Sequence, residues 1–261
     1  MIFGAEEGGG VAFPPIDNIV NWKPWFGEDS IIQFDKVSFI SLLAMAIPAL
    51  IFFLARGGSA DNPSKLRMFG EKIVDFVEEQ IAKPGIGHGY EPFIPLLTAL
   101  FLFISVGNLF EVIPFFQMPL NARMGAPVVL ALVAYVMWIA VGLKHNGPGL
   151  IKEMLFPPGV PKALYLLVTP IEFLSNFIIR PFSHAVRLFA NMLAGHILLV
   201  TFSVLVIATF KLGVISIVGF VGSFAGLVAF TAFEIGVSFI QGFVFAILTA
   251  VYIGLALHPA H

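Results

Sequence analysis

The segment Ala185-Val-Arg-Leu-Phe-Ala-Asn-Met-Leu-Ala-Gly-His196 places the guanidinium of Arg187 inside a long apolar run. An arginine at the centre of a bilayer costs roughly 2.5–3.5 kcal/mol on insertion scales, and it cannot escape by losing its proton. Such a side chain faces a protein interior, a water-filled cavity or a counter-ion. The segment therefore predicts a membrane helix in which Arg187 has a functional role, with a structural ion pair between helices as the alternative.

The composition of the whole chain indicates an integral membrane protein. Hydrophobic residues make up 58% of the 261 residues and charged residues 11%, and the mean hydropathy is +0.95. Soluble proteins contain about 25% charged residues. The chain has no cysteine, which excludes disulfides, thiol catalysis and thiolate metal sites. Lysines and arginines do not cluster, so the sequence does not indicate a nucleic-acid partner. It also contains no glycine-rich nucleotide-binding motif.

The chain divides into segments by hydropathy and turn residues. We expect the following organisation: a polar leader without signal-peptide features at 1–35, a first spanning helix at 36–55, an amphipathic surface helix at 62–83, a spanning helical hairpin at 92–143, a turn-rich loop at 144–162 and a long helical region at 163–261. Basic residues are more frequent in 56–83 and 144–162 than in 117–125. The positive-inside rule then places the leader and the 117–125 turn outside and the 144–162 loop inside.

The last region contains two apolar runs that are each too long for one upright span. A helix over residues 164–210 would be about 70 Å long, whereas the hydrocarbon core is about 30 Å thick. Residues 212–257 pose the same problem. Each run either contains a tight turn and makes two spans, or forms one long, strongly tilted helix, and the fold class is all-α in both cases.

Polar side chains of the first run share one helical face. They recur at intervals of three or four residues: Glu172, Asn176, Arg180, His184, Arg187 and Asn191. Residues at these intervals lie on one face, and in lipid that face must meet protein or water. For Arg180, both a functional role and a snorkelling position at the membrane interface fit the sequence.

The second run carries one charge, Glu234, with Ser238 and Gln241 on the same face. Symmetrical folding of the two runs about Lys211 would bring Glu234 level with Arg187 and leave His196 about eight residues away. A buried carboxylate and an imidazole are typical of a proton path.

The motif Arg187-Leu-Phe-Ala-Asn191-Met-Leu-Ala-Gly195-His196, with Arg180-Pro181 before it and Glu234 and Gln241 after it, resembles the a subunit of F-type ATP synthases. The resemblance extends to Asn108-Leu-Phe-Glu-Val-Ile-Pro114 and runs from about residue 36 to the end. It implies an all-α membrane stator whose two long C-terminal helices form a strongly tilted hairpin.

The same resemblance implies the setting and the partners of the chain. We expect a multi-pass protein of the bacterial plasma membrane, without a catalytic site or cofactor of its own. Its expected partners are a ring of c subunits, b-type peripheral stalk subunits, the rest of the ATP synthase and the bilayer. The transported ion, proton or sodium, depends on the ring, and protons are the default.

The family also implies an ion path. The arginine that matches Arg187 faces the ion-binding carboxylates of the rotating c ring, and two offset half-channels reach that interface from opposite sides. The matching positions are Arg187, Asn191, His196, Glu234, Gln241, Glu111 and Glu172. Of these, Asn191, His196, Glu234 and Gln241 match the outer half-channel and Glu111 matches its entrance.

Glu172 departs from the family pattern. Many relatives carry an acidic residue 14 positions before the arginine, whereas Glu172 lies 15 positions before Arg187 and the extra residue falls between Glu172 and Pro181. An inner half-channel role and a helix-positioning role both remain open for it.

Two other classes of function are compatible with buried charges. A secondary transporter would be expected to show inverted repeats and a midplane site, and no convincing repeat relates the two halves. A purely structural anchor would leave Arg187, His196 and Glu234 without a purpose.

Overall fold

The computed structural model describes residues 25–26, 34–57, 64–113, 115–156, 161, 164–211 and 217–257. Most of the expected leader, parts of the 144–162 loop and the connection at 212–216 lie outside the described residues. Within the described ranges the chain is helical, and its β pairing is the isolated bridge between Phe26 and Phe34.

Five helices in the described residues are long and apolar enough to span a membrane. They are α2 (Lys36–Leu54), the run of η2 (Glu91–Phe93) and α5 (Ile94–Leu109), α6 (Gly125–Asn146), the run of α8 (Tyr165–Leu174), η5 (Ser175–Ile179) and α9 (Arg180–Lys211), and α10 (Ile217–Leu257). The shorter elements are α3 (Lys65–Val77), η1 (Glu78–Ala82), α4 (Lys83–Ile86), η3 (Leu120–Ala122) and α7 (Gly149–Leu155). The all-α, multi-pass prediction is confirmed.

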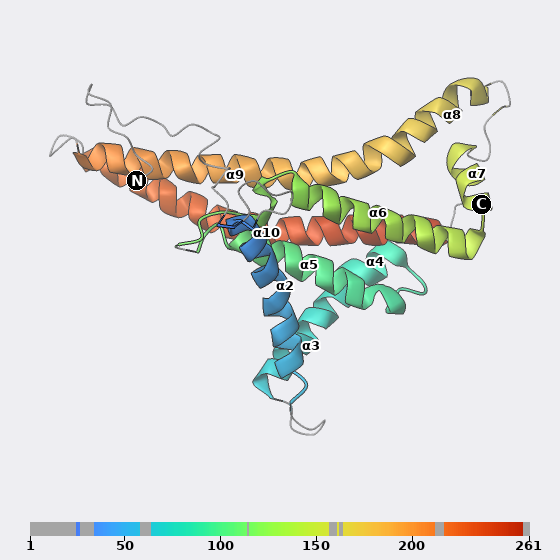
Figure 1. The fold of residues 1–261 in the computed structure, drawn as a ribbon, viewed down its shortest axis with the longest axis horizontal. Coiled ribbons are helices and arrows are strands. Elements are labelled where there is room, and N and C mark those ends of the chain that lie inside the picture. The colour runs from blue at the N-terminus through green and yellow to red at the C-terminus, as the bar shows by residue number, and fades with distance from the viewer. Residues whose placement is uncertain are drawn as a thin grey trace.

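Each of the two C-terminal runs forms one long helix rather than two spans. The apolar span of the first run, Tyr165–Phe210, covers 46 residues and the second run covers 41, which correspond to about 69 and 62 Å. Figure 1 shows α9 and α10 running side by side from the left of the view, with α5 and α6 beside α10, α8 diverging from it on the right and α2 crossing. Helices of this length fit a hydrocarbon core of about 30 Å only at a steep tilt.

Two π-helical segments occur among the described residues, and each stands directly before a basic residue and a proline. The backbone N–H of Lys83 and that of Arg180 each bond to the carbonyl five residues earlier, at the ends of η1 and η5. Proline lacks an N–H, and its ring clashes with the carbonyl four residues before it. The wider π turn accommodates Pro84 and Pro181, so the helix that carries Arg187 continues through its proline.

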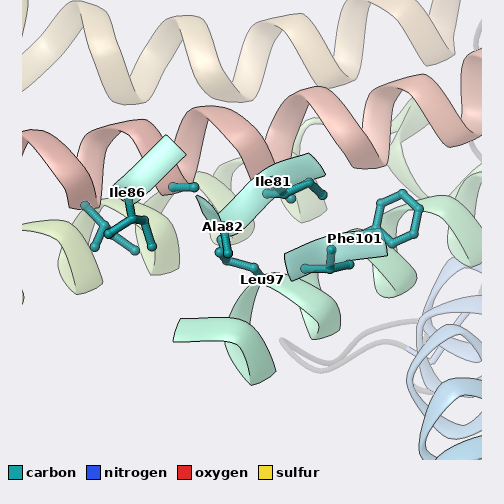
Figure 2. Close-up of a cluster of buried hydrophobic side chains, with 9 residues drawn as sticks. Ile81, Ala82, Ile86, Leu97 and Phe101 are labelled. Atoms are coloured by element: carbon teal, nitrogen blue, oxygen red, sulfur yellow. The ribbon is translucent and has the colours of Figure 1, made fainter. Parts of the chain in front are cut away.

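The largest apolar core lies where η1, α4 and α5 pack against the C-terminal half of α10. Figure 2 shows Ile81, Ala82 and Ile86 opposite Leu97 and Phe101; the remaining members of the cluster are Val77, Ala246, Ala250 and Ile253. Glycines allow the backbones to approach closely, because a Cβ on Gly254 would lie 2.5 Å from the carbonyl oxygen of Gly85. This packing fixes the C-terminal half of α10 against the first half of the chain.

An ion pair joins the start of α2 to the turn before α6. Asp35 accepts hydrogen bonds from the backbone N–H and the hydroxyl of Ser38, at 2.8 and 3.0 Å, and it also pairs with Arg123. Burial alone would raise the pKa of Asp35, but the Ser38 hydrogen bonds and the Arg123 charge outweigh it and hold that pKa below its ordinary value. The folded state therefore stabilises the Asp35 carboxylate.

We predict that Asp35→Asn lowers the unfolding temperature of the detergent-solubilised protein near neutral pH, by the equivalent of about 1–2 kcal/mol. Because the folded-state pKa is depressed, the contribution of Asp35 is complete above the ordinary value of 3.8 and is lost as the pH falls through the folded-state pKa. The difference between wild type and variant should therefore shrink below about pH 4. Glu71→Gln, at the exposed pair with Arg67, is the control; a difference that does not depend on pH would contradict the assignment.

Candidate functional site

Three ionisable side chains from three parts of the chain meet in a buried cluster. Glu111 follows α5, His196 belongs to α9 and Glu234 to α10, with exposed fractions of 3%, 5% and 2%. The Nδ1 atom of His196 lies 3.2 Å from Oε1 of Glu111, and the Glu111 carboxylate interacts electrostatically with Glu234. The described residues contain no group of three side chains suited to a metal ion.

Gly195 provides the space that Glu234 occupies. A Cβ at position 195 would overlap the Glu234 carboxylate, so Glu234 lies level with Gly195 and beside His196 rather than level with Arg187. The expected symmetrical folding about Lys211 is wrong in register. The connection between α9 and α10 runs through residues 212–216, and its midpoint therefore lies beyond Lys211.

A polar seam continues from the cluster between α5 and α10. Ser105 and Ser238 are buried there, and a Cβ on Gly242 would overlap the Ser105 hydroxyl. Buried side-chain oxygens of Glu111, Glu234, Ser105 and Ser238 have no hydrogen-bond partner among the described residues. Buried polar groups are normally hydrogen-bonded to protein or water, so a seam of this kind is suited to hydration.

Ser105, Gly195 and Gly242 were not predicted as site residues. One signal was available for Ser105, because Ser105, Asn108 and Glu111 recur every three residues from the end of α5 into the turn after it. The glycines gave no such signal, since their role depends on the side chain that each one meets on another helix. A buried hydrogen bond of 2.7 Å from Asn121 to Asn108 also joins the turn after α5 to the same face.

Arg187 lies on the outer face of α9. Its side chain is exposed, as are those of Ala190, Asn191 and Ala194 on the same face. No ion pair or hydrogen bond engages its guanidinium within the part of the chain that the structure describes. Across the α9–α10 contact, Arg187 shares a narrow crevice with the buried side chain of Gln241. The structure thus presents a charge on a surface whose other exposed side chains, apart from Asn191, are small and apolar.

Aromatic rings hold Arg180 between α6 and α10. Its guanidinium lies 5.7 Å from the ring centres of both Trp138 and Tyr252, a distance at which cation–π attraction is significant. His184 is buried one turn further on, with its ring centre 4.0 Å from that of Phe245. A position between two helices does not fit a side chain that snorkels to the membrane interface, so it favours the other role open for Arg180, a functional one within the protein.

Glu172 is far from the other predicted site residues. Its carboxylate accepts a hydrogen bond of 3.1 Å from the Asn176 amide, which also donates to the backbone carbonyl of Met154 in α7. Glu172 lies 15 residues before Arg187 and His196 lies nine residues after it, about 22 and 14 Å along the helix. Two polar sites therefore lie on opposite sides of Arg187.

Comparison with known proteins gives a consistent result over most of the chain. The family described as "ATP synthase A chain" matches residues 38–254. The chain is 42% identical over 229 residues to ATP synthase subunit a of Rhodococcus erythropolis, covering 87% of this chain and 83% of the relative. It is 38% identical over 253 residues to ATP synthase subunit a of Frankia alni, with coverage of 95% and 87%.

If the seam between α5 and α10 is hydrated, a cysteine placed in it should react with a small polar thiol reagent such as silver ion. We predict that Ser238→Cys is labelled in membrane vesicles at least tenfold faster than Ala250→Cys. Both positions lie in α10 and are 0% exposed, but Ala250 belongs to the apolar core. This chain has no cysteine, so the introduced residue is the single thiol of the variant chain, whose labelling is measured after its purification. Equal rates at the two positions would show that the seam is dry.

Proposed function

The chain belongs to the ATP synthase A chain family, and we propose that it conducts protons to and from a rotating c ring through two half-channels separated by Arg187. With five candidate spans and bacterial relatives, it is a multi-pass subunit a of the bacterial plasma membrane. In this proposal it has no catalytic site of its own. Its partners are the c ring, b-type peripheral stalk subunits and the rest of the complex.

The observation that carries the proposal is the exposed guanidinium of Arg187 on a long apolar helix. A charge in this setting needs an opposite charge or water, and the described part of the chain supplies no carboxylate to it. A carboxylate of the c ring would supply the missing partner. The small side chains of Ala190 and Ala194 on the same face would let that partner approach closely.

The permanent charge of Arg187 performs two tasks in this mechanism. It favours the ionised form of each ring carboxylate that passes, so that carboxylate releases its proton to one half-channel. It also repels a proton that would cross directly between the half-channels. A charge that moves across 100 mV releases about 2.3 kcal/mol, and this energy drives rotation only if that direct route is closed.

The outer half-channel would run through the buried cluster and the polar seam. Glu111 stands at its entrance, and His196 and Glu234 exchange protons along it. Gln241, buried beside Arg187, and Asn191, exposed one turn from Arg187, continue the path to the ring. The unpartnered oxygens of the seam support this route, because they offer several hydrogen-bonding positions to water.

The inner half-channel would begin near Glu172. The π-helical segment Ser175–Ile179 lies between Glu172 and Pro181, in the interval that contains the extra residue of this chain. A π turn takes up one additional residue within a helix. Glu172 therefore keeps the angular position, relative to Arg187, of an acidic residue 14 positions away, which favours the channel role over helix positioning.

We predict that Arg187→Lys abolishes ATP-driven proton pumping in membrane vesicles, to below about a tenth of the wild-type rate, although the charge is formally kept. A lysine in apolar surroundings can release its proton and then no longer blocks direct transfer. Pumping is followed by the quenching of a pH-sensitive dye.

Immunoblotting should show that the Arg187→Lys protein is assembled in normal amounts. The exposed neighbour Ala190→Gly is the matched control on the same face, and it should pump normally. Wild-type pumping by Arg187→Lys would refute the role of the permanent charge.

A second prediction concerns the space beside Glu234. Gly195→Ala places a methyl group where the Glu234 carboxylate lies, so we expect pumping to fall at least tenfold. Gly236→Ala adds the same methyl group two residues from Glu234, where no atom lies within 4 Å, and it should leave pumping unchanged. If both variants pump alike, the close contact between Gly195 and Glu234 is not needed for the path.

A further inference from the structure

A cavity of about 610 Å³ lies apart from the ion path, at the opposite end of α10 from the connection to α9. The turn before α5, the last turn of α6 and the last residue of α10 form its wall. This interfacial pocket combines two kinds of side chain. His88, Lys144 and His145 are basic, and Phe93, Val141 and Leu257 are among its apolar members.

All three segments of the wall lie at span ends on the same side of the membrane. The chain enters the membrane at the start of η2, returns at the end of α6 and returns again at the end of α10. Since they line one cavity, these three ends face the same compartment. The distribution of basic residues assigns that compartment as the inner one, which places the pocket at the level of the inner-leaflet headgroups.

We propose that the interfacial pocket binds the headgroup of an anionic phospholipid of the inner leaflet. Lys144 and His145 stand in the last turn of α6, where an ammonium and an imidazole can donate hydrogen bonds to a phosphodiester. The apolar wall beside them suits the glycerol backbone and the first acyl carbons. A free phosphate ion would not use that apolar wall, so the mixed lining favours a lipid.

Glu91 is the one acidic member of the wall within the described residues. Its carboxylate repels an anion and so weakens anion binding. Removing this charge should therefore have the opposite effect on binding to removing a basic residue. Removing a basic residue should reduce lipid binding, and removing the Glu91 charge should increase it. A site that recognises only apolar surface would respond to neither change.

The proposal is tested by photo-cross-linking in vesicles that contain the assembled ATP synthase and a photoactivatable phosphatidylglycerol. Cross-linked peptides should include residues 88–93 or 141–146. Unlabelled phosphatidylglycerol should compete, whereas phosphatidylcholine and inorganic phosphate should not. Lys144→Gln should reduce the yield about fivefold, the effect expected for one basic residue near an anionic surface, and Glu91→Gln should raise it.

Lys72→Gln is the matched control, because Lys72 is an exposed lysine of α3 on the same predicted side of the membrane. Its yield should equal that of wild type, and ATP-driven pumping verifies assembly for every variant. Equal competition by phosphatidylcholine, or an unchanged yield in both Lys144→Gln and Glu91→Gln, would overturn a charge-selective lipid site. Competition by inorganic phosphate would assign the pocket to a soluble anion instead. These outcomes are independent of the half-channels, since none of them involves Arg187.

Discussion

The constraint on which the rest of the structure depends is the permanent charge of Arg187 on a helix surrounded by apolar side chains. A guanidinium cannot be neutralised by proton loss, so the surrounding protein has to provide for the charge. The chain leaves this guanidinium exposed beside Ala190 and Ala194 and does not pair it with a carboxylate of the described residues. On the same helix Glu172 lies about 22 Å before Arg187 and His196 about 14 Å after it, which is the arrangement that the two proposed half-channels require.

Glycines decide which polar groups meet. Gly195 admits the carboxylate of Glu234 to the surface of α9, and Gly242 admits the hydroxyl of Ser105 to the surface of α10. Close contact between Gly85 and Gly254 holds the other half of α10 against the first half of the chain. In a membrane, where lipid competes with protein for apolar contact, such close approach is a principal source of helix association. Glycines at helix–helix contacts therefore form the candidate site and also stabilise the packing of the helices.

The sequence predicted the spans and the length of the C-terminal runs, because hydropathy and helical periodicity are local properties. It left open whether those runs turn back, since a tight turn within an apolar segment has no reliable local signal. It gave the wrong register for Glu234, because a few residues in the connection after Lys211 change which levels of two long helices meet. The sequence also did not predict the aromatic rings around Arg180, since Trp138 and Tyr252 come from distant segments.

The spacing of Glu172 shows how a local deviation can preserve a long-range relation. An added residue in a continuous α-helix rotates everything before it by about 100° relative to everything after it, which would move Glu172 from about 40° on one side of Arg187 to about 60° on the other. The π-helical segment Ser175–Ile179 lies in the interval that holds the added residue, and it absorbs the rotation in one wide turn. Pro181 also favours a π turn at this point, because the proline removes a backbone hydrogen bond and its ring crowds the carbonyl four residues earlier. One distortion thus accommodates Pro181 and takes up one residue of the interval between Glu172 and Arg187.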